Sequence, residues 1–520
     1  MKDLRSHIRR KAYLTLIFIV VVSGLLFAIA DSAHMRSDWS DNQTASLSES
    51  TKQVLAELDE PIQIKAYFTD GLPQPYGQLK QFVEDTLLNY RDAAHGNLGF
   101  EMINPEDDAN VQASLQALQI PKVQVQVIED DRAQVRQAYL AMVIEYLDKQ
   151  EIIPVLQTDA GFEYLLTRKI KKLTGKGKQT ITVATGFGAK SSQDLQTLQR
   201  LLQDDYELVD VDLNVDVVPD AVKALIVAGV DKQPSESFRY HLDQFRMTGN
   251  GVLVLASNVK PMLQAGFVVQ PVDSYANDWV LSDLGVSVEP GLVLDQQASR
   301  ITVNQQQGNI AFRSVVDFPF ISNVVNINDS NPLSQGLESV SMPFVAPLLW
   351  RDAGDGRDVL LTSSEWSAVQ SGPPFDVNPL TPMRERFVGL QLAPQALMLV
   401  QEGKMNSTFK QPPESMKDDH HISSVDNGRL LVSGSNALLD NEFIDGNNTI
   451  FILNMMDWLS HDEALIDLRS KGVTQRPLEP LEKQGRTFFK VVWMFALPSL
   501  LLMLGGWRWL AKRKRRALAV

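Results

Sequence analysis

The chain has 520 residues, a formal net charge of −14 and no cysteine. The absence of cysteine excludes disulfides, thiol catalysis, iron–sulfur clusters and cysteine-ligated zinc. Charge is spread unevenly: residues 1–11 hold five basic and one acidic side chain, residues 508–520 hold six basic and no acidic ones, and the body between carries −24. An acidic body repels nucleic acid, so the composition predicts no nucleic-acid partner.

Two uncharged hydrophobic stretches lie near the ends of the chain, at Ala12–Ala30 and Val491–Trp507. As helices they would be about 28 and about 26 Å long, close to the hydrocarbon thickness of a bilayer. Each has a basic cluster on its terminal side, so the positive-inside rule places both termini in the cytoplasm. We predict a two-pass protein of the bacterial inner membrane, with transmembrane helices at 12–30 and 488–510.

Both stretches have an alternative interpretation. Ala28-Ile-Ala30 has the small-x-small form of a signal-peptidase site, so the first stretch is either a retained anchor or a cleaved signal. The second is either a membrane helix or a buried core helix; Trp493, Trp507 and Trp509 favour the membrane, because tryptophan is enriched at its interfaces. With two retained anchors, residues 1–11 and 511–520 are cytoplasmic tails.

The region 31–175 has the pattern of a small α/β domain. Ser46-Leu-Ser-Glu49 resembles a capping box and predicts a short helix ending before Pro61. We expect strands at Ile62–Phe68, Leu98–Ile103, Val123–Ile128 and Leu140–Tyr146 with a continuation at Ile152–Val155, and helices at Gln78–Ala93, Val111–Leu118 and Phe162–Leu173. The order βαβαββα is that of a thioredoxin-like domain. Without cysteine, this fold would be a scaffold and no oxidoreductase.

The region 176–473 has a second alternation of strands and helices, which predicts a doubly wound α/β domain with buried parallel strands. We expect strands at Thr180–Thr185, Glu207–Leu213, Val222–Val230, Gly251–Ala256, Arg429–Ser433 and Ala464–Leu468, and helices at Leu195–Leu202, Ser237–Thr248 and Asn448–Leu459. A β-rich insertion of unassigned topology occupies about 279–425 and includes an exposed loop at Lys410–Ser424. Residues 474–487 form a linker to the second span.

No motif in the body assembles a convincing catalytic or cofactor site. Gly186-Phe-Gly188 follows a strand and opens a helix, but Ser191 stands where a dinucleotide site has its third glycine, so a tight turn is favoured over a nucleotide site. Lys176–Thr180 lacks the first glycine of a phosphate loop. Asp418-Asp-His-His421 is interpreted as a solvated loop, with a metal site as the alternative. We predict that the protein is not an enzyme and that it binds no cofactor, no metal and, directly, no nucleotide.

A series of short motifs resembles the auxiliary subunits of ABC-type transport systems, which include the gliding-motility Gld-type proteins. These motifs are Ser46-Leu-Ser with Thr51, Val54 and Pro61, Thr185-Gly-x-Gly188, Leu242–Gly249, Gly434-Ser-Asn with Asn441, Asn454–Leu459, Leu465–Arg469 and Arg476-Pro-Leu478. The chain departs from many relatives at Phe187 and Ala189, where His and Glu are common, and at Ala437, where an acidic residue is common.

The resemblance implies a non-catalytic membrane subunit whose periplasmic domains bind or gate substrate beside an ABC permease and a cytoplasmic ATPase. It also implies an amidotransferase-like fold for the second domain. The alternatives are a periplasmic scaffold or envelope-interaction protein and a membrane-anchored hydrolase. The substrate, the direction of transport and the stoichiometry are not encoded in any recognisable motif.

Two sets of residues are candidates for contact. Open α/β sheets place their ligand crevice at the carboxyl ends of strands. We therefore expect the two glycine turns to lie at the ends of neighbouring strands and to form a substrate or partner crevice from Thr185, Gly186, Gly188, Gly434, Ser435, Asn436 and Asn441. In the second span, Gly505 and Gly506 permit close helix packing and are the candidate permease contact.

Overall fold

The computed structural model describes residues 46–469, apart from 130–131, 160, 176–177, 263–267, 274, 308–309, 417–419, 445, 464 and 467. The chain divides into two units, Met1–Val473 and Thr474–Val520, and the described residues all belong to the first. Both predicted membrane spans lie outside the described residues. Among the described residues, no helix combines the length and the apolar character needed to cross a bilayer.

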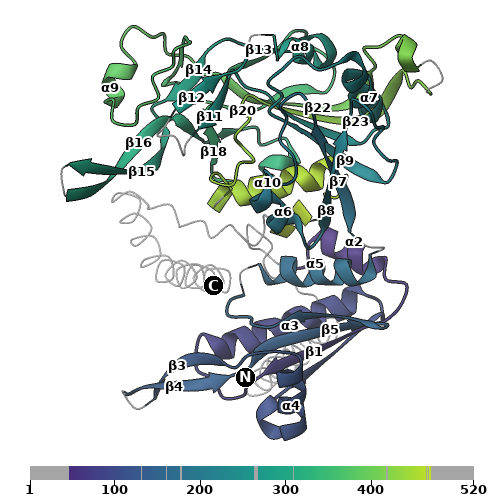
Figure 1. Cartoon of the computed structure of the whole chain (residues 1–520). Coiled ribbons are helices and arrows are strands. Elements are labelled where there is room, and N and C mark those ends of the chain that lie inside the picture. The colour runs from purple at the N-terminus through teal and green to yellow at the C-terminus, as the bar shows by residue number, and fades with distance from the viewer. Residues whose placement is uncertain are drawn as a thin grey trace, which may run out of the picture. The chain divides into compact units, whose positions relative to one another are not determined.

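The first domain is built on a four-stranded sheet (Figure 1). Its strand order is β2 (Leu98–Ile103), β1 (Ile62–Phe68), β5 (Leu140–Tyr146) and β6 (Lys149–Ile153). β1 is parallel to β2 and antiparallel to β5, and β5 is antiparallel to β6. The remaining elements are α2 (Glu49–Ala56), α3 (Tyr76–Ala93), α4 (Ala109–Ala117), α5 (Phe162–Thr174) and the hairpin of β3 (Val123–Glu129) and β4 (Arg132–Ala138).

Helical spacing of apolar side chains explains how the helices attach to this sheet. α3 buries Leu79, Val83 and Leu87, four residues apart along one face. They share one core with the sheet and with α5. The helix start at α2 differs from the prediction, because the N-cap is Ser48, whose Oγ accepts from the Thr51 amide at 3.1 Å. The capping box expected at Ser46 is therefore wrong by two residues.

The second domain contains an eight-stranded sheet. Across the sheet the strands are β17 (Asn326–Ile327), β20 (Arg357–Thr362), β22 (Ala396–Asn406), β23 (Ser424–Ser433), β10 (Gly251–Leu255), β9 (Val222–Ala228), β7 (Gln179–Thr185) and β8 (Tyr206–Asp212). The strands from β23 to β8 are parallel to one another. β22, β20 and β17 are added with antiparallel pairings.

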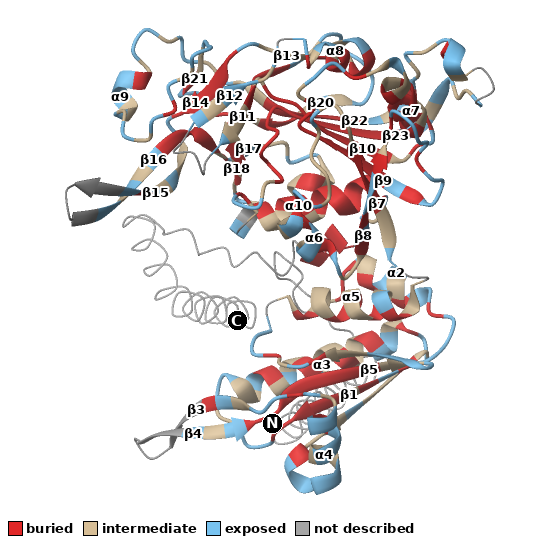
Figure 2. Ribbon diagram, in the orientation of Figure 1, coloured by how far each residue is buried: buried red, intermediate tan, exposed pale blue. Residues whose placement is uncertain are grey.

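Alternation of side chains along the central strands produces two cores. In β9, Ala224 and Ile226 pack with α6 (Gln196–Leu202) and α10 (Gly446–Leu459), whereas Leu225 and Val227 pack with α7 (Glu236–Met247) and α8 (Asp278–Leu284). Figure 2 shows the resulting burial of these strands and of α10. The helices thus cover both faces of the sheet, which explains why its central strands are apolar on both sides.

The predicted insertion at about 279–425 supplies strands to the main sheet as well as small sheets of its own. Its separate pairings are β13 (Val286–Val288) with β19 (Leu348–Trp350), β14 (Leu292–Asp295) with β21 (Ser367–Gln370), and β15 (Ala298–Gln307) with β16 (Ile310–Val324) and β18 (Val340–Pro343). β11 (Val259–Met262) and β12 (Val268–Pro271) form another hairpin, and α9 (Met383–Arg386) is a single turn. Phe318, Phe320 and Phe344 are fully buried in the core of this region.

The strand predicted at Ala464–Leu468 is wrong. Residues 465, 466, 468 and 469 are helical. Leu465, Ile466 and Leu468 are buried there. A short apolar run of this kind fits a buried helical turn as well as a buried strand, and periodicity alone does not separate the two.

Candidate functional site

The two predicted glycine turns lie at the same edge of the large sheet. Gly186 and Gly188 follow β7, and Gly434 follows β23. These strands are parallel, so their carboxyl ends meet at one edge. The prediction that the two strands are neighbours is wrong, because β9 and β10 lie between them. The chain after β23 crosses this gap and reaches the segment that follows Gly188.

Lys190 connects the two turns through a hydrogen bond and an ion pair. Its Nζ donates to the Asn436 carbonyl oxygen at 2.6 Å and forms an ion pair with Asp440. Asn441 adds a second link: its Oδ1 accepts from the Thr197 amide at 2.7 Å. Burial raises the pKa of the Asp440 carboxyl above its usual range, and Lys190 opposes this effect. Neither Lys190 nor Asp440 was among the predicted site residues.

Close approach of the chain accounts for two of the glycines. A Cβ added at Gly188, whose φ is +82°, would lie 1.6 Å from Oδ1 of Asp231. A Cβ at Gly434 would lie 2.1 Å from the carbonyl oxygen of Ala346, which is rigid backbone. Gly434 therefore requires glycine for packing, whereas Gly188 favours glycine because its backbone is left-handed.

Most polar side chains of the predicted crevice form hydrogen bonds within the protein. Thr185 Oγ1 donates to the Val211 carbonyl at 3.2 Å, and Ser435 Oγ donates to the Pro343 carbonyl. The Asn436 side chain is buried and donates from Nδ2 to the Val259 carbonyl at 2.9 Å. Its Oδ1 and Oδ1 of Asp231 are buried without a hydrogen-bond partner among the described residues. These two buried acceptors lie at this edge with unused hydrogen-bonding capacity.

A buried charged network lies near the opposite edge of the sheet. Asp457 of α10 accepts from Arg469 Nη2 at 2.6 Å and from Tyr206 Oη at 2.7 Å. Arg469 also donates to Asn454 of α10, and its guanidinium lies 5.2 Å from the ring centre of Tyr164 in α5. The network thus joins α5 of the first domain, the start of β8 and α10 to the last described residue of the chain.

Asp457 gives the stability of the protein a defined pH dependence. Burial raises the pKa of Asp457 to about 6, although Arg469 and Tyr206 act in the opposite direction. A raised carboxyl pKa makes a contribution to stability that is complete below the unfolded value of about 4 and is lost as the pH rises through about 6, in total about 3 kcal/mol. We expect the free energy of unfolding of the wild type, minus that of D457N, to fall by this amount between about pH 3 and about pH 7.

The measurement is urea unfolding of the full chain in neutral detergent, followed by tryptophan fluorescence. The exposed pair variant D317N is the matched control, because Asp317 carries 58% side-chain exposure. A difference between wild type and D457N that stays constant with pH contradicts the prediction.

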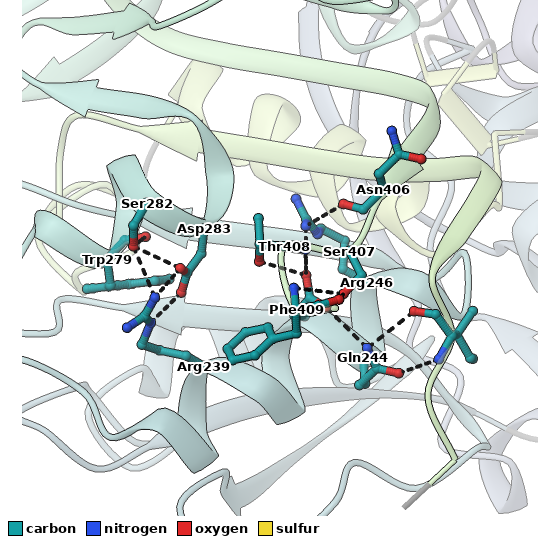
Figure 3. Close-up of polar contacts among 12 residues, drawn as sticks. Arg239, Gln244, Arg246, Trp279, Ser282, Asp283, Asn406, Ser407, Thr408 and Phe409 are labelled. Carbon is teal, nitrogen blue, oxygen red and sulfur yellow. Dashed lines mark hydrogen bonds and ion pairs between the residues drawn. The ribbon is translucent and has the colours of Figure 1, made fainter. Parts of the chain in front are cut away.

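A third polar cluster connects α7 to the segment after β22 (Figure 3). Asp243 is buried and accepts from Arg246 Nη2 at 2.8 Å and from Ser407 Oγ at 2.6 Å. Gln244 binds both backbone groups of Ile422, at 2.7 Å to the amide and 3.3 Å to the carbonyl. The polar face of α7 therefore holds both ends of the predicted loop.

Within that loop, the described part of the Asp418-Asp-His-His421 motif packs against α7. The His421 ring is stacked on Tyr240, with ring centres 6.1 Å apart and an interplanar angle of 15°. Asp418 and Asp419 lie outside the described residues. Among the residues that the structure describes, no group of three or more His, Cys, Asp or Glu side chains has the arrangement of a metal site.

The described fold defines a mixed α/β protein with helices on both faces of a mainly parallel sheet. The family model of an ABC-type uncharacterized transport system matches residues 178–461, which is more than half of the chain. The protein therefore belongs to this family of ABC-transport auxiliary proteins, which confirms the predicted family at this level. A second model, of a domain of unknown function, matches residues 41–145.

Other similarities are more distant. An uncharacterized protein of Borreliella burgdorferi is 20% identical over 527 residues, covering 96% of this chain and 97% of its own length. Among solved structures, the mmIFT52 N-terminal domain is 12% identical, covers 54% of this chain and 97% of its own, and has a TM-score of 0.33. A putative ThuA-like protein from Parabacteroides merdae is 13% identical, with 54% and 90% coverage and a TM-score of 0.29.

Proposed function

We propose that the protein is a non-catalytic, membrane-anchored auxiliary subunit of an ABC-type transporter. The observation that carries this proposal is the family match over residues 178–461. The two uncharged spans of the sequence, each with a basic cluster on its terminal side, support anchoring by two helices with both termini in the cytoplasm. The body between them then lies in the periplasm, where it meets substrate beside the permease.

The first domain acts in this proposal as a thioredoxin-like scaffold. Its strand order, with β1 and β5 antiparallel in the middle and β2 and β6 at the edges, supports that assignment. The second domain acts as an amidotransferase-like recognition module. Its contact edge is the carboxyl edge of the sheet, where Asn436 and Asp231 keep unused acceptors. The Gld-type subgroup is the proposed place of the chain within its family.

Energy for transport has to come from a partner. The proposal assigns ATP hydrolysis to a cytoplasmic ATPase and assigns the mechanical link to the second span, where Gly505 and Gly506 permit close packing against a permease helix. Replacing both glycines by leucine places two large side chains on that contact. We expect the variant G505L/G506L to lose most of the permease that copurifies with the wild type.

The experiment is gentle detergent extraction of the tagged full chain, followed by identification of the bound proteins. M494L/M503L is the matched control, since it exchanges large apolar side chains within the same span. An equal yield of permease and ATPase from both variants contradicts the glycine contact. Recovery of the wild type without a permease or an ATPase contradicts the transport proposal and favours a periplasmic scaffold.

A further inference from the structure

A cavity of about 660 Å³ opens at the amino edge of the large sheet, opposite to the glycine turns. Its volume lies within the range of small-molecule sites. α5 contributes residues to one wall, and the starts of β7, β8 and β9 contribute the other. Five basic residues line it: Arg168, Lys171, Lys172, Lys178 and Lys223.

Three of these cations are already compensated. Arg168 pairs with Asp205, with its Nε 2.7 Å from Oδ2. Lys171 pairs with Asp462, and Lys172 Nζ lies 2.8 Å from Oε1 of Glu151. The acidic residues of the lining, Asp204, Asp205 and Asp462, are the ones that make these pairs or face them.

Lys178 and Lys223 are the two lining cations that these carboxylates do not compensate. Both are exposed, and neither forms an ion pair with any residue of the described part of the chain. The lining therefore has two more positive than negative groups, within a protein whose net charge is −14. Such a local excess in an acidic protein attracts anions selectively, because the surrounding surface repels them.

The cavity also offers hydrogen bonding beyond the two ammonium groups. Gln179 lines it, and its Oε1 is buried without a hydrogen-bond partner among the described residues. Its Nε2 is held at 3.4 Å from Oδ2 of Asp462, which fixes the amide. A free acceptor beside two free ammonium groups suits a ligand that carries both an anionic group and a hydroxyl donor.

We propose that this cavity binds a phosphate-bearing ligand, with Lys178 and Lys223 contacting phosphate oxygens and Gln179 accepting from a hydroxyl. Lysine suits phosphate as a point charge, and charge-assisted hydrogen bonds are the strong ones. The same chemistry belongs to an anionic lipid headgroup and to a small soluble phosphate compound. The site goes beyond the transport role proposed above and stands independently of it.

The test uses the full chain in neutral detergent and two probes. The first is inorganic pyrophosphate, titrated calorimetrically; the second is phosphatidylglycerol in mixed micelles, compared with phosphatidylcholine. We expect K178Q/K223Q to weaken binding of the recognised probe about tenfold or more, since each substitution removes a charged hydrogen bond. K404Q/K410Q removes the same charge from exposed lysines outside the cavity and is expected to bind as the wild type does.

The two probes separate the sources of the phosphate group. Loss of pyrophosphate binding in the cavity variant supports a small soluble ligand, and loss of phosphatidylglycerol binding alone supports a lipid headgroup. Thermal unfolding of both variants provides the folding check, because exposed lysines contribute little to stability. The proposal is overturned if the wild type binds neither probe, or if the cavity variant and the control variant bind them equally well.

Discussion

Replacing Arg469 by alanine is expected to lower the free energy of unfolding of the full chain by about 3–5 kcal/mol, because the change leaves Asp457 buried without its counter-ion. Asp457 is 1% exposed and Arg469 is 5% exposed, so water does not reach the carboxyl, which without its partner either stays charged at a high cost or takes up a proton. Its remaining donor would be Tyr206 Oη at 2.7 Å. The loss also removes the guanidinium from Tyr164, so α5 loses the side chain that connects it to Asn454 and Asp457 of α10.

Urea unfolding in neutral detergent, followed by tryptophan fluorescence, measures this change. Trp458 directly follows Asp457 and is fully buried, so it is one of the eight tryptophans whose emission changes on unfolding. R300A is the control: its pair with Asp317 is exposed, with the Nε–Oδ1 distance at 3.2 Å, and its loss is expected to cost at most about 1 kcal/mol.

A double variant tests the physical cause of the loss. R469A/D457N removes the stranded charge together with its partner, so it is expected to be more stable than R469A alone. If R469A is no less stable than R300A, or if adding D457N lowers the stability further, a buried ion pair does not hold this junction.

The first domain shows which elements a sequence predicts well. Ile62–Phe68 and Leu98–Ile103 were predicted with the bounds that the structure gives to β1 and β2. Both are bounded by turn-forming residues and are followed by helices with clear apolar spacing, so local pattern and global fold agree. Leu465–Leu468 lacked such boundaries, and its burial in a helical turn depends on the surrounding elements.

The strand order of the second domain could not be predicted, because local sequence patterns carry no information on which strands pair. β23 returns to the sheet after a long insertion and pairs with β10, so the glycine turn after it is separated from β7 by two strands. Sequence distance gives no information on that pairing. The bridge from Lys190 to Asp440 follows from this pairing and escaped prediction for the same reason. Lys178 and Lys223 line one cavity because β7 pairs with β9, which local pattern does not contain either.

The buried network did leave a signal in the sequence. Between Gly446 and Leu459, Asp457 is the one charged residue of an otherwise uncharged helix. A lone carboxylate in an apolar helix requires a partner, because an unpaired buried charge is costly. Arg469 lies twelve positions later, at the end of the Leu465–Arg469 motif, and nothing in the sequence pairs it with Asp457. The packing of α10 against the residues that follow it decides which basic residue pairs with the carboxylate.

Replacing Asp243 by alanine is expected to release the segment after β22 from α7 and to destabilise the chain by about 3–5 kcal/mol, since Arg246 is then buried without its ion pair. Asp243 and Arg246 are 3% and 4% exposed. Besides Arg246, the carboxylate holds Ser407 Oγ at 2.6 Å and the Thr408 amide at 3.3 Å (Figure 3). These contacts fix the chain just ahead of Lys410, an exposed trypsin site.

Limited trypsin digestion of the full chain in detergent distinguishes local release from general loss of stability. D243A is expected to be cut at Lys410 under conditions in which the rest of the chain stays intact. D426A is the matched control, because Asp426 is an exposed carboxylate on β23. Equal resistance of D243A and D426A at Lys410 would mean that other contacts hold the segment without the carboxylate. These are the edge-to-face contact of Phe409 with Tyr240, the stack of His421 on Tyr240 and the hydrogen bonds of Gln244 to Ile422. In that case α7 fixes the loop through these ring contacts and Gln244, and its buried ion pair stabilises the helix alone.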